Sequence, residues 1–73
     1  DENDRRYLSI LKDRFKGGPV GLKSLAMALS ETEDTLENTV EPYLLMKGVI
    51  DRTARGRVLR STGIEKYSQD SLF

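Results

Sequence analysis

The stretch Asp51–Arg60 reads DRTARGRVLR, and the rest of the chain can be interpreted around it. It carries four arginines against one acid. Gly56 completes a turn signal near its centre, because glycine supplies the positive φ that a tight or bulged hairpin loop requires. Short runs that contain β-forming residues stand on either side, Gly48–Thr53 and Arg57–Ser61. These features predict a β-hairpin with a guanidinium-coated tip.

The 73-residue chain is neutral, with 12 basic and 12 acidic residues, but the two signs are unevenly distributed. Residues 1–46 hold six basic and nine acidic residues, residues 47–60 hold five and one, and residues 61–73 hold one and two. A positive hairpin on an acidic body is typical of a polyanion contact. The charges alone are equally compatible with a solvated hairpin whose arginines keep its edge from pairing with other chains.

Side-chain alternation along the hairpin predicts which residues face the body of the domain. With a period of two, Ile50 and Val58 turn inward while Arg57 turns out. Arg52 falls on the same face as Ile50, and Leu59 falls on the exposed face, against a later helix or a partner. We expect the arginines as a group to project into solvent rather than to fold back into ion pairs with the helices.

Length and composition exclude several classes of protein. A chain of 73 residues makes one small domain that buries about 60% of the surface its unfolded chain exposes. Cysteine and histidine are both absent, which removes disulfides, thiolate metal ligands and the usual general base. No apolar run approaches the roughly 20 residues of a membrane span, and no signal peptide is visible. We expect a soluble cytoplasmic domain, cut from a longer protein because the chain starts abruptly with DENDRRYL.

Two helices are predicted before residue 30. The first starts near Asn3 or Asp4, either of which can cap it, and ends at the breakers 17–19. Its inward positions are Tyr7, Leu8, Leu11 and Phe15. Val20 then supplies at most a one- or two-residue bridge, and the surrounding GGPVGLKS lacks the glycine before lysine that a phosphate loop needs. The second helix spans 22–29 and buries Leu22, Leu25, Ala26 and Leu29.

The third helix is predicted to run to about Lys47. It follows a capping box in which Ser30 covers an orphan amide and Glu33 reaches back. Its apolar face consists of Leu36, Val40, Tyr43 and Leu44. Pro42 lies inside this helix and removes the hydrogen bond to the carbonyl of Asn38, so the helix must bend or split there.

Beyond the hairpin, Thr62 can cap a short last helix through about Ser68 with Ile64 and Tyr67 facing inward, and residues 69–73 are expected to fray. The predicted order is three helices, a hairpin and a short C-terminal helix. Residues 1–73 are therefore predicted to form a single domain that is mainly α with a small β-hairpin. This is the order of a winged helix-turn-helix, in which the hairpin is the wing.

Three strings carry a family resemblance: GGPVGLKSLAMALSE, TVEPYLLMKG and DRTARGRV. Over roughly Asn3–Tyr67 the chain closely resembles the C-terminal domain of the RuvB family, the bacterial ATP-driven motor of Holliday-junction branch migration. The resemblance implies a sequence-nonspecific DNA-binding head of a hexameric ring helicase in DNA recombination and repair. It also implies a bacterial cytoplasmic location, a RuvA-type junction-binding partner, and upstream ATPase domains that use ATP and magnesium.

The same resemblance assigns DNA contacts. Arg52 and Arg57 match positions through which the family binds DNA. The family commonly places an arginine at the start of the third helix, where this chain has Glu33, and this departure affects a third contact. The remaining candidates on the hairpin are Arg55 at the tip and, as weaker flanking charges, Arg60 and Lys47.

The third helix is itself poorly suited to reading bases. Its first turns hold Glu31, Glu33, Asp34 and Glu37, and only Asn38 among its side chains there suits a bidentate base contact. Arginine forks on phosphates, in contrast, position a protein without reading sequence. Contact with duplex DNA through the hairpin is therefore the preferred interpretation. The alternatives are a winged-helix protein-interaction module and a transcription regulator, and we expect neither catalysis nor a cofactor in this stretch.

Overall fold

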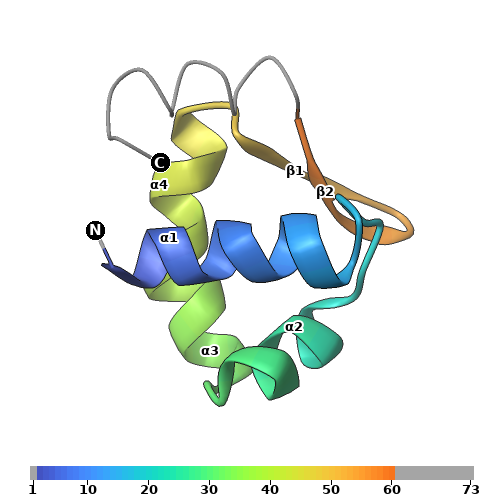
Figure 1. Cartoon of the computed structure of the whole chain (residues 1–73). Helices are drawn as coiled ribbons and strands as arrows, with labels where there is room; N and C mark the ends of the chain where they lie inside the picture. Colours follow the sequence, from blue (N-terminus) through green and yellow to red (C-terminus); the bar gives the residue numbers. More distant parts are fainter. Residues whose placement is uncertain (1, 61–73) are drawn as a thin grey trace.

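The computed structural model describes residues 2–60, which form a helical body with a two-stranded antiparallel hairpin (Figure 1). The elements in chain order are α1 (Glu2–Ser9), the π-helical η1 (Ile10–Arg14), α2 (Leu22–Leu29), α3 (Glu33–Thr35), the π-helical η2 (Leu36–Val40), α4 (Glu41–Met46), β1 (Ile50–Thr53) and β2 (Gly56–Leu59). The predicted mainly helical fold with a small hairpin is confirmed. The predicted last helix from Thr62 to Ser68 and the fraying of residues 69–73 lie outside the described residues.

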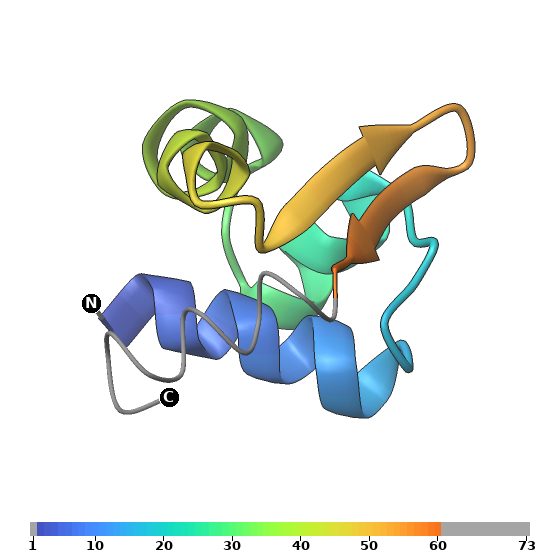
Figure 2. The same cartoon turned by 90° about the horizontal axis from the view of Figure 1, so that it is seen from above.

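The long helical segments cross each other, and the hairpin extends beyond them. Residues 33–46 run without a break through α3, η2 and α4, across the segment formed by α1 and η1 (Figure 1). Seen from above, the hairpin lies alongside both segments at its base, while its loop points away from the helices (Figure 2). We call the hairpin β1–β2 with its connecting turn, residues 50–59, the wing.

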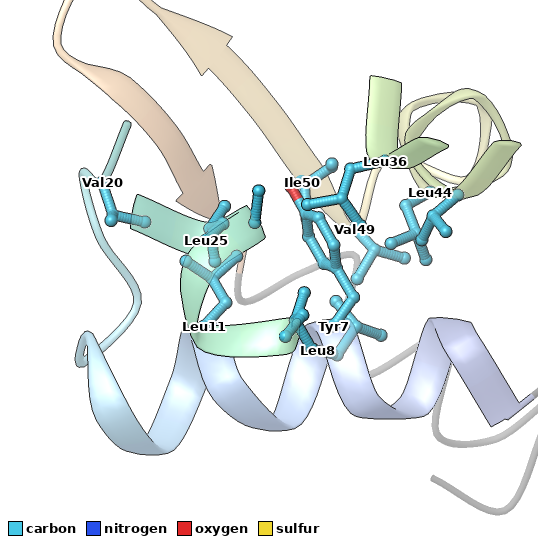
Figure 3. Packing of buried hydrophobic residues seen from close by; sticks show 12 residues of the cluster. Tyr7, Leu8, Leu11, Val20, Leu25, Leu36, Leu44, Val49 and Ile50 are labelled. Atoms are coloured by element: carbon cyan, nitrogen blue, oxygen red, sulfur yellow. The ribbon is translucent and has the colours of Figure 1, made fainter. Parts of the chain in front are cut away.

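The core forms where these elements meet. Tyr7, Leu8 and Leu11 of the first helical segment are completely buried, as the apolar spacing predicted. Figure 3 shows them packed among side chains from α2, η2, α4, β1 and the loop that carries Val20. The other members of the buried cluster are Val20, Leu25, Ala26, Leu29, Leu36, Val40, Leu44, Val49 and Ile50.

Helix ends differ from the prediction in two places. The second helix spans residues 22–29 as predicted, but Ser30 ends it in a left-handed conformation and does not cap the next helix. Thr32 is the cap instead, because it is extended and its side chain accepts a hydrogen bond from the amide of Thr35. The first helix begins at Glu2, so Asn3 and Asp4 lie within its first turn rather than at its cap.

The segment that leads into Pro42 is π-helical. The amide of Glu41, the first residue of α4, donates to the carbonyl of Leu36, five residues back, and Pro42 follows as the second residue of α4. The third helix does not split at Pro42 as the sequence allowed, and the helix type changes next to the proline instead. A π-turn holds one residue more than an α-turn, so later side chains are rotated by about 100° relative to a continuous α-helix.

This rotation explains which side chains of α4 are buried. Leu44 remains completely buried, but Tyr43 is 38% exposed, so the prediction that Tyr43 packs inside is wrong. Glu41, which would point outward on a continuous α-helix, is completely buried. The π-turn therefore replaces a predicted aromatic core residue with a carboxylate.

The wing has a two-residue turn, Ala54 and Arg55, which sets its register. The cross-strand pairs are Ile50 with Leu59, Asp51 with Val58, Arg52 with Arg57 and Thr53 with Gly56. Gly56 has the positive φ that the turn signal predicted. Arg57 also forms an isolated bridge with Val20, which confirms the short bridge expected there.

The register places the two strands differently from the predicted alternation. Opposed residues share a face of a hairpin, so Arg52 and Arg57 lie on the same side as Ile50 and Leu59. The prediction that Arg57 turns out and Val58 turns in is wrong by one residue, which exchanges the two faces of β2. Leu59, expected on the exposed face, packs against the core. Arg52 does share the face of Ile50, as predicted.

Candidate nucleic-acid interface

The wing is attached to the helices through one buried carboxylate, that of Glu41. Its Oε2 accepts hydrogen bonds from the hydroxyl of Tyr7 at 2.5 Å and from Nε of Arg57 at 2.9 Å. Its Oε1 accepts from Nη2 of Arg57 at 2.9 Å and from Nη2 of Arg52 at 3.2 Å. Each oxygen thus has two donors, which fills its lone-pair positions. Three elements, α1, β1 and β2, are joined to α4 at this point.

The protonation states in this cluster are stabilised by their surroundings. Burial alone would raise the pKa of Glu41, but hydrogen bonds from Arg57 and Tyr7 and the adjacent positive charges outweigh it and hold the pKa below its usual value. The pKa of Tyr7 is raised, chiefly by burial and then by its bond to the carboxylate. The bond to Glu41 raises the pKa of Arg57. The cluster is therefore an ionised carboxylate held by guanidinium groups and a neutral phenol.

Arg57 is mainly directed toward the helices. Its guanidinium forms a two-bond fork on Glu41 and lies 3.8 Å from Oε2 of Glu37, and its side chain is only 14% exposed. The expectation that the arginines as a group project into solvent is therefore wrong for Arg57. The physical reason is the register, which puts Arg57 on the inner face of the wing above the buried acid.

Arg52 is held less firmly on the same carboxylate. It makes a single bond to Glu41, and its side chain is 42% exposed. Because a guanidinium carries five N–H donors, most of the hydrogen-bonding capacity of Arg52 is not used by Glu41. Arg52 is therefore bonded to Glu41 at one point, and the rest of its guanidinium group is accessible.

The outer candidates are more exposed. Arg55 lies in the turn of the wing and is exposed, and its guanidinium makes no ion pair with any residue from 2 to 60. Arg60 pairs with Asp51 across the base of the wing at 3.0 Å but remains 59% exposed. Lys47 is half-buried and lies over the ring of Tyr43, with its Nζ 5.7 Å from the ring centroid. The structure therefore places three accessible guanidinium groups on the wing or directly after it, those of Arg52, Arg55 and Arg60.

The start of the third helical segment presents the opposite charge. Glu33 and Asp34 occupy the first turn of α3, are exposed, and suit the positive end of the helix. Asn38 donates to the side chain of Asp34 at 2.7 Å, so the one amide that could contact a base there is already hydrogen-bonded. This part of the helix-turn-helix would repel phosphate.

Close backbone contacts anchor the inner face of the wing. A Cβ on Gly18 would overlap the carbonyl oxygen of Arg57, and one on Gly56 would lie 2.5 Å from the carbonyl oxygen of Val20. Val20 and Arg57 exchange two backbone hydrogen bonds, at 2.7 and 3.0 Å. The wing is thus held to the loop between η1 and α2 as well as to Glu41.

Sequence reasoning missed Glu41 and Tyr7 as members of this site. The string EPYL placed an acid next to an apolar run, but the spacing on a continuous α-helix turned that acid outward. Only the π-turn before Pro42 brings it inside. A tyrosine among the predicted core positions was the one available signal, because a buried phenol normally requires a hydrogen-bond partner.

Residues 2–60 contain neither a candidate membrane span nor a candidate metal site. Within this range no helix has the length and apolar character needed to cross a membrane. The same residues contain no group of three or more acidic side chains placed to hold a metal ion.

Comparison with known proteins places the chain in a family. The family model described as the RuvB C-terminal winged helix domain matches residues 1–68. RuvB subunits of the Holliday junction branch migration complex are similar over 89% of this chain, at 55% identity in Paramagnetospirillum magneticum and 51% in Rickettsia africae. In both cases the aligned part is 19% of the relative, so the chain spans about a fifth of its curated relatives.

A solved structure agrees with the same assignment. The RuvB Holliday junction branch migration motor of Thermotoga maritima matches with a TM-score of 0.86 and 41% identity, over 93% of this chain and 23% of that one. The agreement covers the helical body and the wing described above. The chain therefore belongs to the RuvB family, as its C-terminal winged helix domain.

Proposed function

We propose that this domain is the sequence-nonspecific DNA-contacting head of a branch-migration motor and that its wing binds the phosphate backbone or minor groove of duplex arms. The accessible guanidinium groups of Arg52, Arg55 and Arg60 are the observation that carries the proposal. Guanidinium groups bind phosphate oxygens bidentately and enter narrow minor grooves, where the potential is strongly negative. Such contacts position a protein without reading bases.

Arg57 and Lys47 complete the proposed contact. Glu41 uses Nε and Nη2 of Arg57, so Nη1 is the edge that the guanidinium can offer to a phosphate. Lys47 is a flanking charge beside the wing. Both are secondary to Arg52, Arg55 and Arg60, because both are less exposed.

The distribution of charge favours the wing over the helix-turn-helix. Glu33 and Asp34 are exposed at the start of α3, where many helix-turn-helix proteins contact bases. A motor that moves along any sequence requires contacts that are indifferent to sequence, and arginine contacts to phosphate have this property. The same acidic surface would suit a basic protein partner, which keeps a protein-interaction module as the alternative.

The wider role follows from the family. The curated relatives are named as subunits of the Holliday junction branch migration complex. Since the chain spans about a fifth of their length, we propose that it acts within a longer protein. The remainder would supply ATP and magnesium chemistry, assembly into a hexameric ring and contact with a RuvA-type subunit. Several heads on one ring would bind tightly although each binds weakly.

The test is binding of the 73-residue chain to two duplexes of unrelated sequence and equal length over a salt series. We expect a dissociation constant of about 10⁻⁴ to 10⁻⁶ M that is equal for both duplexes, with a slope of log K against log salt of about −2 to −4. The double variant Arg52→Ala and Arg55→Ala should lose most of this binding.

Arg5→Ala is a control for the loss of positive charge elsewhere on the domain, because it removes one exposed positive charge from α1. The N-terminal end of α1 lies on the other side of the molecule from the loop of the wing (Figure 1). Binding to neither duplex at low salt would contradict DNA contact and favour protein docking. Strong preference for one duplex would favour a regulator.

A further inference from the structure

We infer that Glu41, held by Tyr7, is the positioning residue for DNA binding by the wing: it fixes Arg57 and holds Arg52 by one bond that a phosphate can replace. The inference rests on the proposed function and assigns roles within that site. Neither Glu41 nor Tyr7 contacts DNA in this scheme, because both are completely buried.

The geometry around the carboxylate supplies the first reason. One side chain from α1, one from β1 and one from β2 converge on Glu41 of α4, with distances from 2.5 to 3.2 Å. Tyr7 occupies one lone pair of Oε2, which leaves the other for Nε of Arg57 and orients Oε1 toward the wing. The phenol therefore decides which edge of the carboxylate the arginines meet.

The two arginines are held unequally, and this is the second reason. Arg57 has two bonds of 2.9 Å to Glu41 in a fork geometry and is 14% exposed, whereas Arg52 has one bond of 3.2 Å and is 42% exposed. Two parallel bonds to a carboxylate are stronger and more specific in direction than one. A phosphate oxygen that approaches the wing can replace the single bond of Arg52, while Arg57 stays on the acid and keeps the strand in place.

The charge of Glu41 allows the inference to be tested, because a positioning role and a purely electrostatic role predict opposite effects on DNA binding. Glu41 is a negative charge beneath a surface that binds polyanions. If it acted only through its charge, neutralising it would strengthen DNA binding. If it positions Arg52 and Arg57, neutralising it would weaken binding, because the two guanidinium groups would lose their orientation.

The experiment compares Glu41→Gln with Glu37→Gln in the 73-residue chain. Both variants remove one negative charge near Arg57, but Glu37 is half-exposed and its Oε2 lies 3.8 Å from that arginine. DNA binding is measured with one duplex over a salt series, at a temperature at which circular dichroism shows each variant folded. We expect Glu37→Gln to bind as tightly as the original chain or more tightly. Glu41→Gln should bind about tenfold more weakly, with a salt slope smaller by about one.

A double variant separates positioning from general loss of stability. In the original chain, Arg52→Ala should weaken binding and reduce the salt slope by about one. On the Glu41→Gln background the same change should have little further effect, because an unpositioned Arg52 already contributes little. Equal effects of Arg52→Ala on both backgrounds would overturn the inference.

If Glu41→Gln does not fold, Tyr7→Phe takes its place, because it keeps the carboxylate and both arginines and removes only the hydroxyl that orients Oε2. Folded Tyr7→Phe should bind DNA more weakly, and binding at the original level would overturn the inference. The outcomes for the two proposals are distinct. Failure of the original chain to bind any duplex refutes the proposed function, whereas normal binding of the original chain and equal or tighter binding of Glu41→Gln refutes the positioning role alone.

Discussion

The inner face and the tip of the wing carry the same residue type in opposite surroundings. Arg57 lies on the inner face, where it makes two hydrogen bonds to the completely buried Glu41, and its side chain is 14% exposed. Arg55, two residues away in the turn, is exposed and makes no ion pair within residues 2–60. The difference shows that an arginine-rich string is not one surface: the strand register divides it into guanidinium groups that hold the wing and guanidinium groups that are available to a ligand.

Removal of the buried acid should have the largest effect on the inner face. Glu41→Ala leaves Arg57, Arg52 and the Tyr7 hydroxyl without their shared acceptor, and breaking a buried pair costs about 3 to 5 kcal/mol. Urea unfolding followed by circular dichroism would measure the loss. Glu37→Ala is the control, since it removes a half-exposed acid and should change stability by at most about 1 kcal/mol. Equal losses for the two variants would refute a special role for the buried carboxylate.

The next largest effect concerns the backbone that holds the inner face. Gly18 has φ of 84°, and a Cβ there would overlap the carbonyl of Arg57. Gly18→Ala therefore combines an unfavourable backbone conformation with a steric clash, and should cost about 2 to 5 kcal/mol. Gly48→Ala is matched, because φ is 73° but nothing lies within 4 Å of the added Cβ. That variant should cost only about 1 kcal/mol, and thermal unfolding of the two would show whether the clash matters.

Acid should weaken the inner face, which depends on the ionised Glu41, whereas the turn at Ala54 and Arg55 carries no carboxylate. The pKa of Glu41 is below its usual value of 4.5 in the folded chain. Its ionised form therefore contributes stability that is fully present above pH 4.5 and is lost as pH falls through the depressed folded value. Unfolding free energies measured from pH 6 downward should fall more steeply for the original chain than for Glu41→Gln. Parallel curves would show that another carboxylate controls acid unfolding.

The smallest effect on stability is expected at the tip. Arg55→Ala removes an exposed side chain from the turn, so the free energy of unfolding should change by no more than about 0.5 kcal/mol. The salt slope of duplex binding should nevertheless fall by about one, because one phosphate contact is lost. A large loss of stability with an unchanged slope would reverse the roles assigned to tip and inner face.

Local sequence patterns were sufficient to predict the main elements of the fold. The helix at residues 22–29, the buried positions Tyr7, Leu8 and Leu11, and the turn at Gly56 follow from apolar spacing and from glycine placement. The Val20 bridge was likewise expected from one β-branched residue between breakers. These features depend on residues close together in the chain, where periodicity and turn chemistry act directly.

The site depended on information that local patterns do not contain. Tyr43 was placed inside because its spacing from Leu36 and Val40 was taken at the α-helical period, and the π-turn instead leaves Tyr43 partly exposed and buries Glu41, which the apolar pattern did not include. Likewise, a shift of one residue in register exchanged Arg57 and Val58 between the two faces of β2. In each case a single inserted or shifted residue changes every side chain that follows, which spacing alone cannot reveal.

A small helical domain with an arginine-rich hairpin could be predicted without coordinates, because charge, glycine positions and apolar spacing are properties of neighbouring residues. Which arginines are accessible depends instead on how the elements pack. The acceptor for Arg57 lies 16 residues away in the chain, and the tyrosine that completes the same carboxylate lies 34 residues from it. Contacts between such distant residues exist only once the helices and the wing have packed, so the division between holding and binding arginines is a product of the fold.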